Sequence, residues 1–175
     1  ATASQLEMRA GRLEVQAEQV GFLGFCEKWY HLSSPQTLPL QRFDAIFMRK
    51  DPPIDSAYLY ACQILAMAEK QGVRVVNRPQ SLLGFNEKLL ISLFPHCIPE
   101  TLVTARGDGV EAMKAFVELH EDVICKPLQG MGGAGIFRVR QQDPNLQVIW
   151  EQMTDKGLQP IMIQRYLPEV IDGDK

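Results

Sequence analysis

Residues 123–140, which read VICKPLQGMGGAGIFRVR, constrain the fold more than any other stretch of the chain. They open with the apolar run Val123–Cys125, which is typical of a buried strand, and Lys126 comes directly after that run. Glycines at 130, 132, 133 and 135 follow, and Ile136–Arg140 then alternates apolar and charged residues. Glycine adopts positive φ and lets the backbone approach a ligand closely, and successive N–H groups in such a loop can bind an anion. The order strand, lysine, glycine loop, strand therefore predicts a flap over phosphates.

Other glycine-rich patterns share part of this sequence. Gly130, Gly132 and Gly135 match the dinucleotide fingerprint G-x-G-x-x-G, in which the third glycine opens a helix. The period of two after Gly135 favours a strand instead, so we reject that interpretation. A Walker A loop is also disfavoured, because its lysine follows the glycines and Lys126 precedes them. A plain hairpin with a glycine-rich turn and no ligand stays open on this stretch alone.

Composition narrows the classes of function. The 175 residues are 46% hydrophobic and 22% charged, which is ordinary for a globular protein. Eighteen basic and 21 acidic residues give a net charge of −3, so we expect no nucleic-acid partner. No apolar run approaches the ~20 residues that span a bilayer, and we expect no membrane partner. The three histidines lack ligand spacing, and the four cysteines are far apart, which predicts reduced thiols in a cytoplasmic protein and no metal site.

Hydrophobic periodicity predicts a strand–helix–strand unit in the first half of the chain. Asp55 is typical of an N-cap, and Gly72 suits the C′ position after the helix. Such a unit predicts a parallel sheet with a right-handed crossover. The expected elements are a hairpin turning at Ala10–Gly11, a loop at 33–37, a buried strand at 44–48, the helix between Asp55 and Gly72, and a strand at 73–76.

A change in composition near residue 85 predicts a domain boundary. Asn77–Pro79 and Gly84 contain turn-forming residues, so we expect one domain at 1–85 and another at 86–175. The elements expected in the second domain are a helix at 86–94 capped by Asn86, strands at 101–104 and 160–166, helices at 110–120 and 143–153, and the lysine–glycine hairpin between them.

Six separated blocks resemble one known family. They are MRKDPP (48–53), VNRPQSL (76–82), NEKL (86–89), ICKPLQGMGGAGIFRV (124–139), QRYLP (164–168) and DGDK (172–175). In this order and spacing they closely resemble bacterial glutathione synthetase, an ATP-grasp ligase. The resemblance covers nearly the whole chain, more weakly before Phe43. It implies an α/β fold in which a partial Rossmann-like (pre-ATP-grasp) N-terminal domain precedes the first half of an ATP-grasp domain.

The resemblance also implies the site residues. Lys88 and Lys126 would be catalytic and contact the phosphates of ATP. The other ATP-binding residues would be Gln129, Gly130, Met131, Gly132 and Gly133 over the phosphates, Gln164, Tyr166 and Leu167 at the adenine, and Asp174 at the ribose hydroxyls. Arg49, Lys50 and Asp51 follow the carboxyl end of an expected strand, where open α/β sheets bind ligands, so we expect them to face the peptide substrate. A solvated turn is the alternative for these three residues.

By resemblance, the function is the ATP-dependent ligation of γ-glutamylcysteine to glycine through an acyl phosphate, giving glutathione, ADP and phosphate. Magnesium is implied, with ligands in a C-terminal half expected beyond Lys175, so we expect these 175 residues alone to make no glutathione. A homo-oligomer is implied for the full-length form. The alternatives are another ATP-grasp carboxylate–amine ligase, such as a glutamate ligase or a D-alanine–D-alanine ligase, or a non-catalytic nucleotide-binding module.

Overall fold

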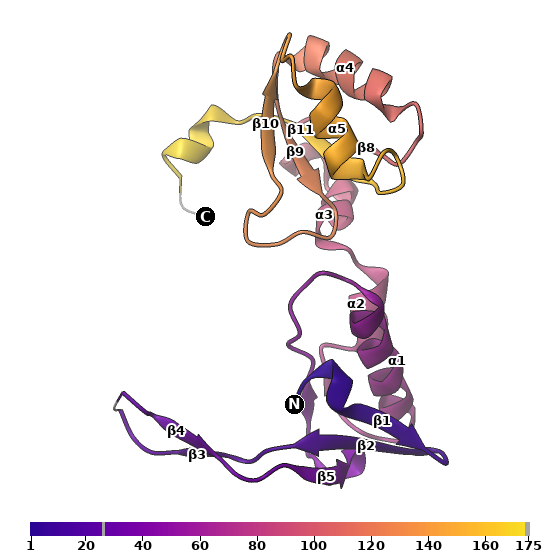
Figure 1. Cartoon of the computed structure of the whole chain (residues 1–175), viewed down its shortest axis with the longest axis vertical. Helices are drawn as coiled ribbons and strands as arrows, with labels where there is room; N and C mark the ends of the chain where they lie inside the picture. Colours follow the sequence, from indigo (N-terminus) through magenta and orange to yellow (C-terminus); the bar gives the residue numbers. More distant parts are fainter. Residues whose placement is uncertain (26, 174–175) are drawn as a thin grey trace. The chain divides into compact units, whose positions relative to one another are not determined.

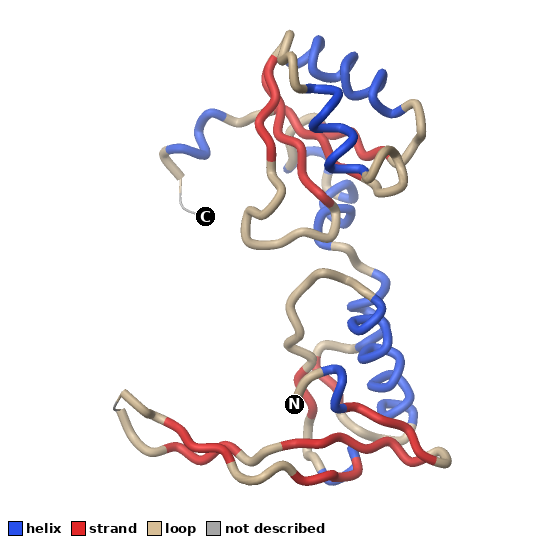
Figure 2. Tube along the Cα trace, viewed as in Figure 1, coloured by secondary structure: helices blue, strands red, loops and turns tan. Residues whose placement is uncertain are grey.

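The computed structural model describes residues 1–25 and 27–173, and the chain divides into two compact units, residues 1–84 and 85–175 (Figure 1). Each unit combines strands with helices, as Figure 2 shows by colour. The α/β class predicted from the sequence is therefore confirmed.

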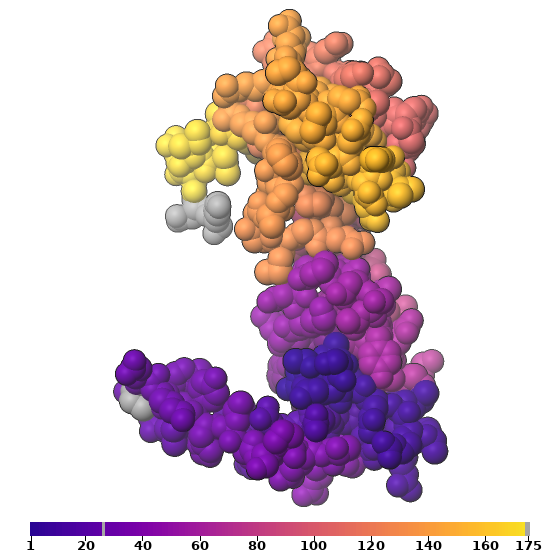
Figure 3. Space-filling view, viewed as in Figure 1, coloured from indigo at the N-terminus to yellow at the C-terminus, as the bar shows by residue number. Residues whose placement is uncertain are grey.

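The strands of the first unit form three small groups. They are β1 (Leu6–Arg9), β2 (Arg12–Ala17) and β5 (Gln36–Pro39) in one antiparallel sheet, β3 (Val20–Phe22) and β4 (Tyr30–Leu32) in an antiparallel arm, and β6 (Ile46–Phe47) and β7 (Val75–Val76) in a parallel pair. The hairpin around Ala10–Gly11 and the parallel pairing are confirmed. The arm of β3 and β4 projects from the rest of this unit (Figures 1 and 3).

Helix α1 (Ser56–Lys70) connects β6 to β7 through a loop at each end and buries one apolar face in the core of the first unit. The Asp55 carboxylate accepts a hydrogen bond from the Tyr58 N–H at 2.7 Å, and this bond holds the pKa of Asp55 below its usual range. Gly72 follows the C-cap residue Gln71 with φ of +91°, as a C′ glycine does. The predicted N-cap and C′ residues are thus confirmed. A short helix, α2 (Pro79–Gly84), ends this unit.

Three predictions for the first unit are wrong in extent, one of them the strand expected at 73–76, of which only Val75–Val76 forms β7. The sequence predicts a loop over 33–37, but Gln36 and Thr37 already pair with β2. The buried strand predicted over 44–48 has only two residues in the ladder, and Phe47 is 66% exposed. The Ile46 N–H donates to the Arg74 carbonyl at 2.8 Å and the Met48 N–H donates to the Val76 carbonyl at 2.7 Å, so these two alternate residues bind the segment around β7.

The second unit contains one four-stranded antiparallel sheet. Its order is β10 (Phe137–Arg140), β9 (Asp122–Pro127), β11 (Ile161–Arg165) and β8 (Thr101–Thr104). The residues after Gly135 therefore form a strand, which confirms the rejection of the dinucleotide fingerprint.

Helices α4 (Gly109–His120) and α5 (Leu146–Thr154) cover one face of this sheet (Figures 1 and 2). The core between them consists of Val123, Cys125, Val139, Ile161 and Ile163 from the strands and Met113, Val117, Leu146 and Trp150 from the helices. Because side chains alternate along a strand, the even-numbered residues of β9, β10 and β11 point to the opposite face. That opposite face carries Lys126 and Gln164.

Helix boundaries in the second unit differ from the prediction. Helix α3 (Glu87–Leu90) is followed by a 3₁₀ turn at Ile91–Leu93 instead of continuing to Phe94, because the residue before Pro95 is kept out of the α region. Helix α5 begins three residues later than predicted. There the Asp143 carboxylate accepts the Asn145 N–H at 2.9 Å, and this local turn replaces the first helical turn.

Gly109→Ala tests the packing of α4 against α5. A Cβ on Gly109 would lie 2.3 Å from Cη2 of Trp150, which is buried. We expect overpacking to lower the free energy of unfolding by about 1–3 kcal/mol. Gly107→Ala is the matched control, because nothing lies within 4 Å of its added Cβ. Urea unfolding of both variants checks the prediction, and equal midpoints would contradict it.

Candidate functional site

The glycine loop, residues 129–135, joins the adjacent ends of β9 and β10 (Figure 1). Within it the Ala134 N–H donates to the Met131 carbonyl at 3.1 Å, and Gly132 and Gly133 have φ of +61° and +79°. Positive φ at both central positions of a turn favours glycine. At Gly130 a Cβ would lie 2.7 Å from Cγ of Pro127, so the chain passes the proline ring too closely for a side chain. The glycine pattern thus has a local structural cause.

A small hollow of about 170 Å³ lies between this loop and the start of α3. Its lining consists of Glu87, Lys88, Pro127, residues 130–134 and Ile136. Gly130, Met131, Gly132 and Gly133, which the sequence assigns to phosphate binding, are therefore brought together around one cavity. Gln129 is exposed beside them and is not part of the lining.

Lys88 connects α3 to the glycine loop. Its Nζ donates to the Gly130 carbonyl at 2.6 Å and lies 3.0 Å from a carboxylate oxygen of Glu87. The side chain is only 16% exposed. Lys88 thus lies beneath the loop with its ammonium group at the cavity, which is where a phosphate-binding lysine is needed.

Asn86 adds a second connection between α3 and the strand that leads into the loop. Its side-chain oxygen accepts the Lys88 and Leu89 N–H groups at 3.0 and 3.2 Å, which is the N-cap that the sequence predicts. The same side chain donates from Nδ2 to the Leu128 carbonyl at 3.1 Å. Sequence reasoning missed this second contact, because an N-cap pattern carries no information about a partner 42 residues away.

Lys126 begins a hydrogen-bond chain that crosses three strands. Its Nζ donates to Oε1 of Gln164 at 2.6 Å, and Nε2 of Gln164 donates to Oγ1 of Thr101 at 2.8 Å. The Thr101 hydroxyl in turn donates to the Pro99 carbonyl at 2.7 Å. An ammonium group can only donate hydrogen bonds, so the side-chain oxygen of the buried Gln164 must face Lys126 and its NH₂ group must face Thr101. The sequence analysis did not identify Thr101.

The surroundings of Lys126 disfavour the charged form of its side chain. Burial, together with the positive charge of Lys88, lowers the pKa of Lys126 below its usual value. In the part of the chain that the structure describes, its acceptor is a neutral amide and no ion pair includes it. The positive charges of Lys126 and Lys88 therefore repel each other, and an anion bound at Lys126 would offset both this repulsion and the cost of burial.

Tyr166 and Leu167 directly follow β11. The Tyr166 N–H donates to the Asp122 carbonyl at 2.9 Å, which extends the pairing with β9 by one residue beyond the strand. Pro168 then begins a 3₁₀ turn that runs to Ile171. Asp174, assigned to the ribose by the sequence, lies outside the described residues.

Arg138 on β10 contacts both Asp122 and Tyr166. Its Nε and Nη2 donate to the two carboxylate oxygens of Asp122 at 2.9 and 2.6 Å, and its Cζ lies 3.6 Å from the centre of the Tyr166 ring. The guanidinium holds the pKa of Asp122 below its usual range. Sequence reasoning missed this cluster. The sequence feature that could have indicated the cluster is the spacing of Arg138 and Arg140, two residues apart on one strand. With the hairpin register known, this spacing places both arginines on the same face of the sheet as Asp122.

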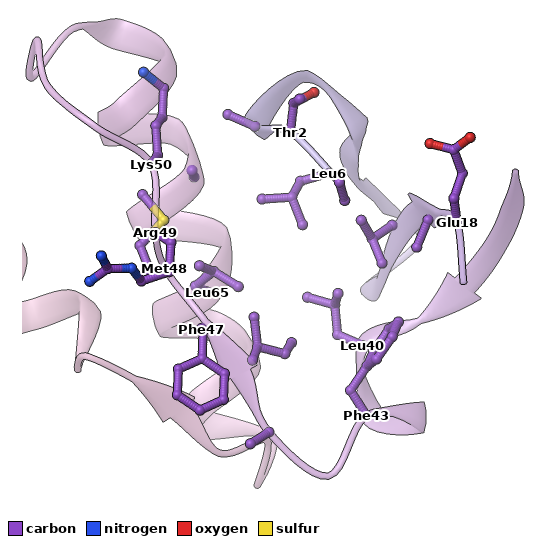
Figure 4. Close-up of a pocket in the computed structure, with 17 residues that line it drawn as sticks. Thr2, Leu6, Glu18, Leu40, Phe43, Phe47, Met48, Arg49, Lys50 and Leu65 are labelled. Atoms are coloured by element: carbon purple, nitrogen blue, oxygen red, sulfur yellow. The ribbon is translucent and has the colours of Figure 1, made fainter. Parts of the chain in front are cut away.

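Arg49, Lys50 and Asp51 belong to the first unit. Arg49 and Lys50 line a largely apolar cavity of about 570 Å³ there, and Asp51 does not. Figure 4 shows Leu6, Leu40 and Leu65 around this hollow, whereas the Arg49 guanidinium points away from it. Lys50 lies 3.8 Å from the Asp55 carboxylate and 5.7 Å from the centre of the Tyr58 ring. Their contact with a peptide substrate stays a prediction.

Residues 1–25 and 27–173 contain no metal-ligand cluster and no helix suited to span a membrane. No group of three or more His, Cys, Asp or Glu side chains in that part of the chain could hold a metal ion. None of the helices described there has the length and apolar character needed to cross a bilayer.

Two family models match the chain. The model described as the N-terminal domain of prokaryotic glutathione synthetase matches residues 1–82, and the model described as its ATP-grasp domain matches residues 87–175. Glutathione synthetase of Vibrio cholerae is 53% identical over 84% of this chain and 45% of its own length. The Escherichia coli enzyme is 52% identical over 85% and 46%, and the Pseudomonas aeruginosa enzyme 45% over 97% and 53%. The chain thus spans about half the length of these relatives.

Two solved structures share the fold of this chain. D-cycloserine synthetase DcsG superposes with a TM-score of 0.56 at 18% identity, covering 76% of this chain and 47% of its own. D-alanyl-alanine synthetase A from Vibrio cholerae gives 0.52 at 11% identity, covering 93% and 48%. Together with the match to the ATP-grasp domain, these likenesses confirm the predicted fold class.

The pKa of Lys126 should rise when the charge of Lys88 is removed. Lys88→Met keeps most of the aliphatic stem but abolishes the repulsion between the two ammonium groups. We expect the pKa of Lys126 to increase without reaching the ordinary value of 10.5, because its burial remains. NMR titration of the labelled lysine Cε groups measures it. Lys114→Met, at an exposed position on α4, is the control, and an unchanged or lower pKa in Lys88→Met would contradict the prediction.

Proposed function

We propose that this chain, which belongs to the prokaryotic glutathione synthetase family, binds ATP around Lys126 and supplies that site to an ATP-dependent ligase. The proposed reaction joins γ-glutamylcysteine to glycine and yields glutathione, ADP and phosphate. One observation carries the proposal: Lys88 lies against the glycine loop and its cavity, and Lys126, on the strand that leads into that loop, has a neutral amide as its acceptor among the described residues. The identity of 53% to a relative named glutathione synthetase, against 18% to D-cycloserine synthetase, favours this substrate.

At the phosphate end the proposed work is charge neutralisation and positioning. In the reaction the γ-phosphoryl group passes to the cysteinyl carboxylate, and the glycine amine attacks the resulting acyl phosphate. We assign Lys126 and Lys88 to the phosphate oxygens, with N–H groups of the glycine loop as further donors. A single charge pair at ~4 Å contributes about 4 kcal/mol at an effective dielectric of 20. The loop over the phosphates would also keep water from the acyl phosphate.

At the adenine end the proposed groups belong to the backbone. The Tyr166 N–H is already bonded to Asp122, so we assign the Tyr166 carbonyl to the N6 amine and the Leu167 N–H to N1. The sequence analysis also placed Gln164 at the adenine. Because its amide is bonded to Lys126 and Thr101, we propose instead that Gln164 orients Lys126. Asp174 stays assigned to the ribose by resemblance alone.

Other features of the proposed enzyme rest on the family resemblance. Magnesium is expected, but the described residues offer no cluster that fits it, so no step proposed here depends on a metal ligand of this chain. We keep Arg49, Lys50 and Asp51 as candidates for the peptide substrate. We also propose that the protein acts in the cytoplasm as a homo-oligomer.

Lys126→Ala should weaken ATP binding. Loss of a hydrogen bond to a charged group typically costs about 1.5–3 kcal/mol, which corresponds to roughly a tenfold to 150-fold rise in Kd. Isothermal titration calorimetry of the chain with ATP measures the change. Lys114→Ala removes an equal charge from an exposed pair on α4 and should leave the Kd unchanged. Equal ATP affinity of the two variants would refute the assignment of Lys126 to the phosphates.

The substrate assignment is tested by the product. A protein that contains this chain and has the length of its relatives is incubated with ATP, magnesium, γ-glutamylcysteine and either glycine, D-alanine or glutamate. We expect glutathione by mass spectrometry with glycine, and one phosphate released for each molecule formed. Faster phosphate release with another acceptor amine would assign the protein to a different carboxylate–amine ligase.

A further inference from the structure

Asp122, Arg138 and Tyr166, here called the Arg138 cluster, lie on the same face of the sheet as Lys126. In the strand register Arg138 is opposite Ile124, and Ile124 is opposite Gln164. Cross-strand partners share a face, so the guanidinium points to the side that carries the hydrogen-bond chain of Lys126. None of the contacts assigned to ATP above uses Arg138.

The Arg138 cluster fixes Tyr166 from two directions. The Asp122 carboxylate holds the guanidinium by two hydrogen bonds, at 2.9 and 2.6 Å, and the Cζ of Arg138 lies 3.6 Å from the centre of the Tyr166 ring. The Asp122 carbonyl accepts the Tyr166 N–H at 2.9 Å. One residue of β9 thus holds the backbone of Tyr166 directly and its side chain through Arg138.

We propose that Arg138 is a positioning residue for the adenine end of the nucleotide. By fixing the Tyr166 ring, it sets the direction of the peptide unit between Tyr166 and Leu167, which carries the two groups assigned to adenine. The inference rests on the proposed function. Arg138 itself touches no ligand atom and acts through Tyr166.

A purely structural role explains the cluster less well. The Arg138 side chain is 38% exposed, so solvent screens its ion pair with Asp122 and limits what even this bidentate geometry adds to stability. Preorganising a binding segment, in contrast, acts directly on ligand affinity, because the segment need not be ordered when the ligand binds. Arg140 provides a natural comparison. It lies on the same strand and face, approaches the same Asp122 carboxylate at 3.5 Å, and is 69% exposed.

The test compares Arg138→Met with Arg140→Met in the whole chain, using ATP and inorganic tripolyphosphate as probes in calorimetry. Tripolyphosphate can make the phosphate contacts of ATP but has no adenine. Arg138→Met should raise the Kd for ATP about five- to thirtyfold and leave the Kd for tripolyphosphate unchanged. Arg140→Met should change neither Kd by more than about twofold. Lys126→Ala should weaken both ligands.

Two further variants show whether Arg138 acts through Tyr166. Tyr166→Leu removes the ring that Arg138 contacts, and like Arg138→Met it should raise the Kd for ATP and not the Kd for tripolyphosphate. The double variant Arg138→Met/Tyr166→Leu should be no weaker than either single one, because both remove the same contact. Arg138→Lys keeps a charge but not the planar fork, and it repeats the test should the methionine variant unfold.

The inference is overturned if Arg138→Met weakens tripolyphosphate as much as ATP, or if Arg140→Met weakens ATP equally. Additive effects of the Arg138 and Tyr166 variants would overturn it as well. A failure of the proposed function looks different, because the unaltered chain would then bind neither ATP nor tripolyphosphate.

Discussion

The hydrogen bond between Lys126 and Gln164 is the contact on which the proposed site depends. A lysine that is partly withdrawn from water needs acceptors for its N–H groups, and here the acceptor is a neutral amide at 2.6 Å. The amide orients the ammonium group but leaves its charge uncompensated. A glutamate at the same position would form an ion pair and remove the net charge that attracts a phosphate. The neutral partner Gln164 therefore leaves Lys126 available for an anion, whereas Lys88 already pairs with the Glu87 carboxylate at 3.0 Å.

The antiparallel sheet makes this arrangement possible because its two faces serve two different tasks, stability and ligand binding. One face is apolar and is buried under α4 and α5, so it supplies stability. The opposite face carries Lys126, Gln164 and Arg138, whose hydrogen bonds run from strand to strand. Since successive residues alternate between the faces, a six-residue strand such as β9 contributes to both tasks at once.

Local sequence signals predicted the elements that depend on local chemistry. The caps at Asp55 and Asn86, the C′ glycine at 72 and the strand after Gly135 each follow from neighbouring residues. Predicted boundaries were wrong where one residue interrupts a periodic pattern, as Pro95 and Asp143 do. The contacts of Thr101 and of Arg138 could not be found, because they join residues whose proximity exists only once strand order and register are fixed.

Strand β9 connects the two ends of the proposed nucleotide site. Asp122, its first residue, holds the backbone of Tyr166, and Lys126 lies four residues further on. At about 3.3 Å per residue these positions are ~13 Å apart along a rigid strand. A ligand with a base at one end and a polyphosphate at the other would meet two groups of contacts whose separation the strand fixes. Because different side chains serve the two ends, the contributions of the base and the phosphates to affinity are physically separable.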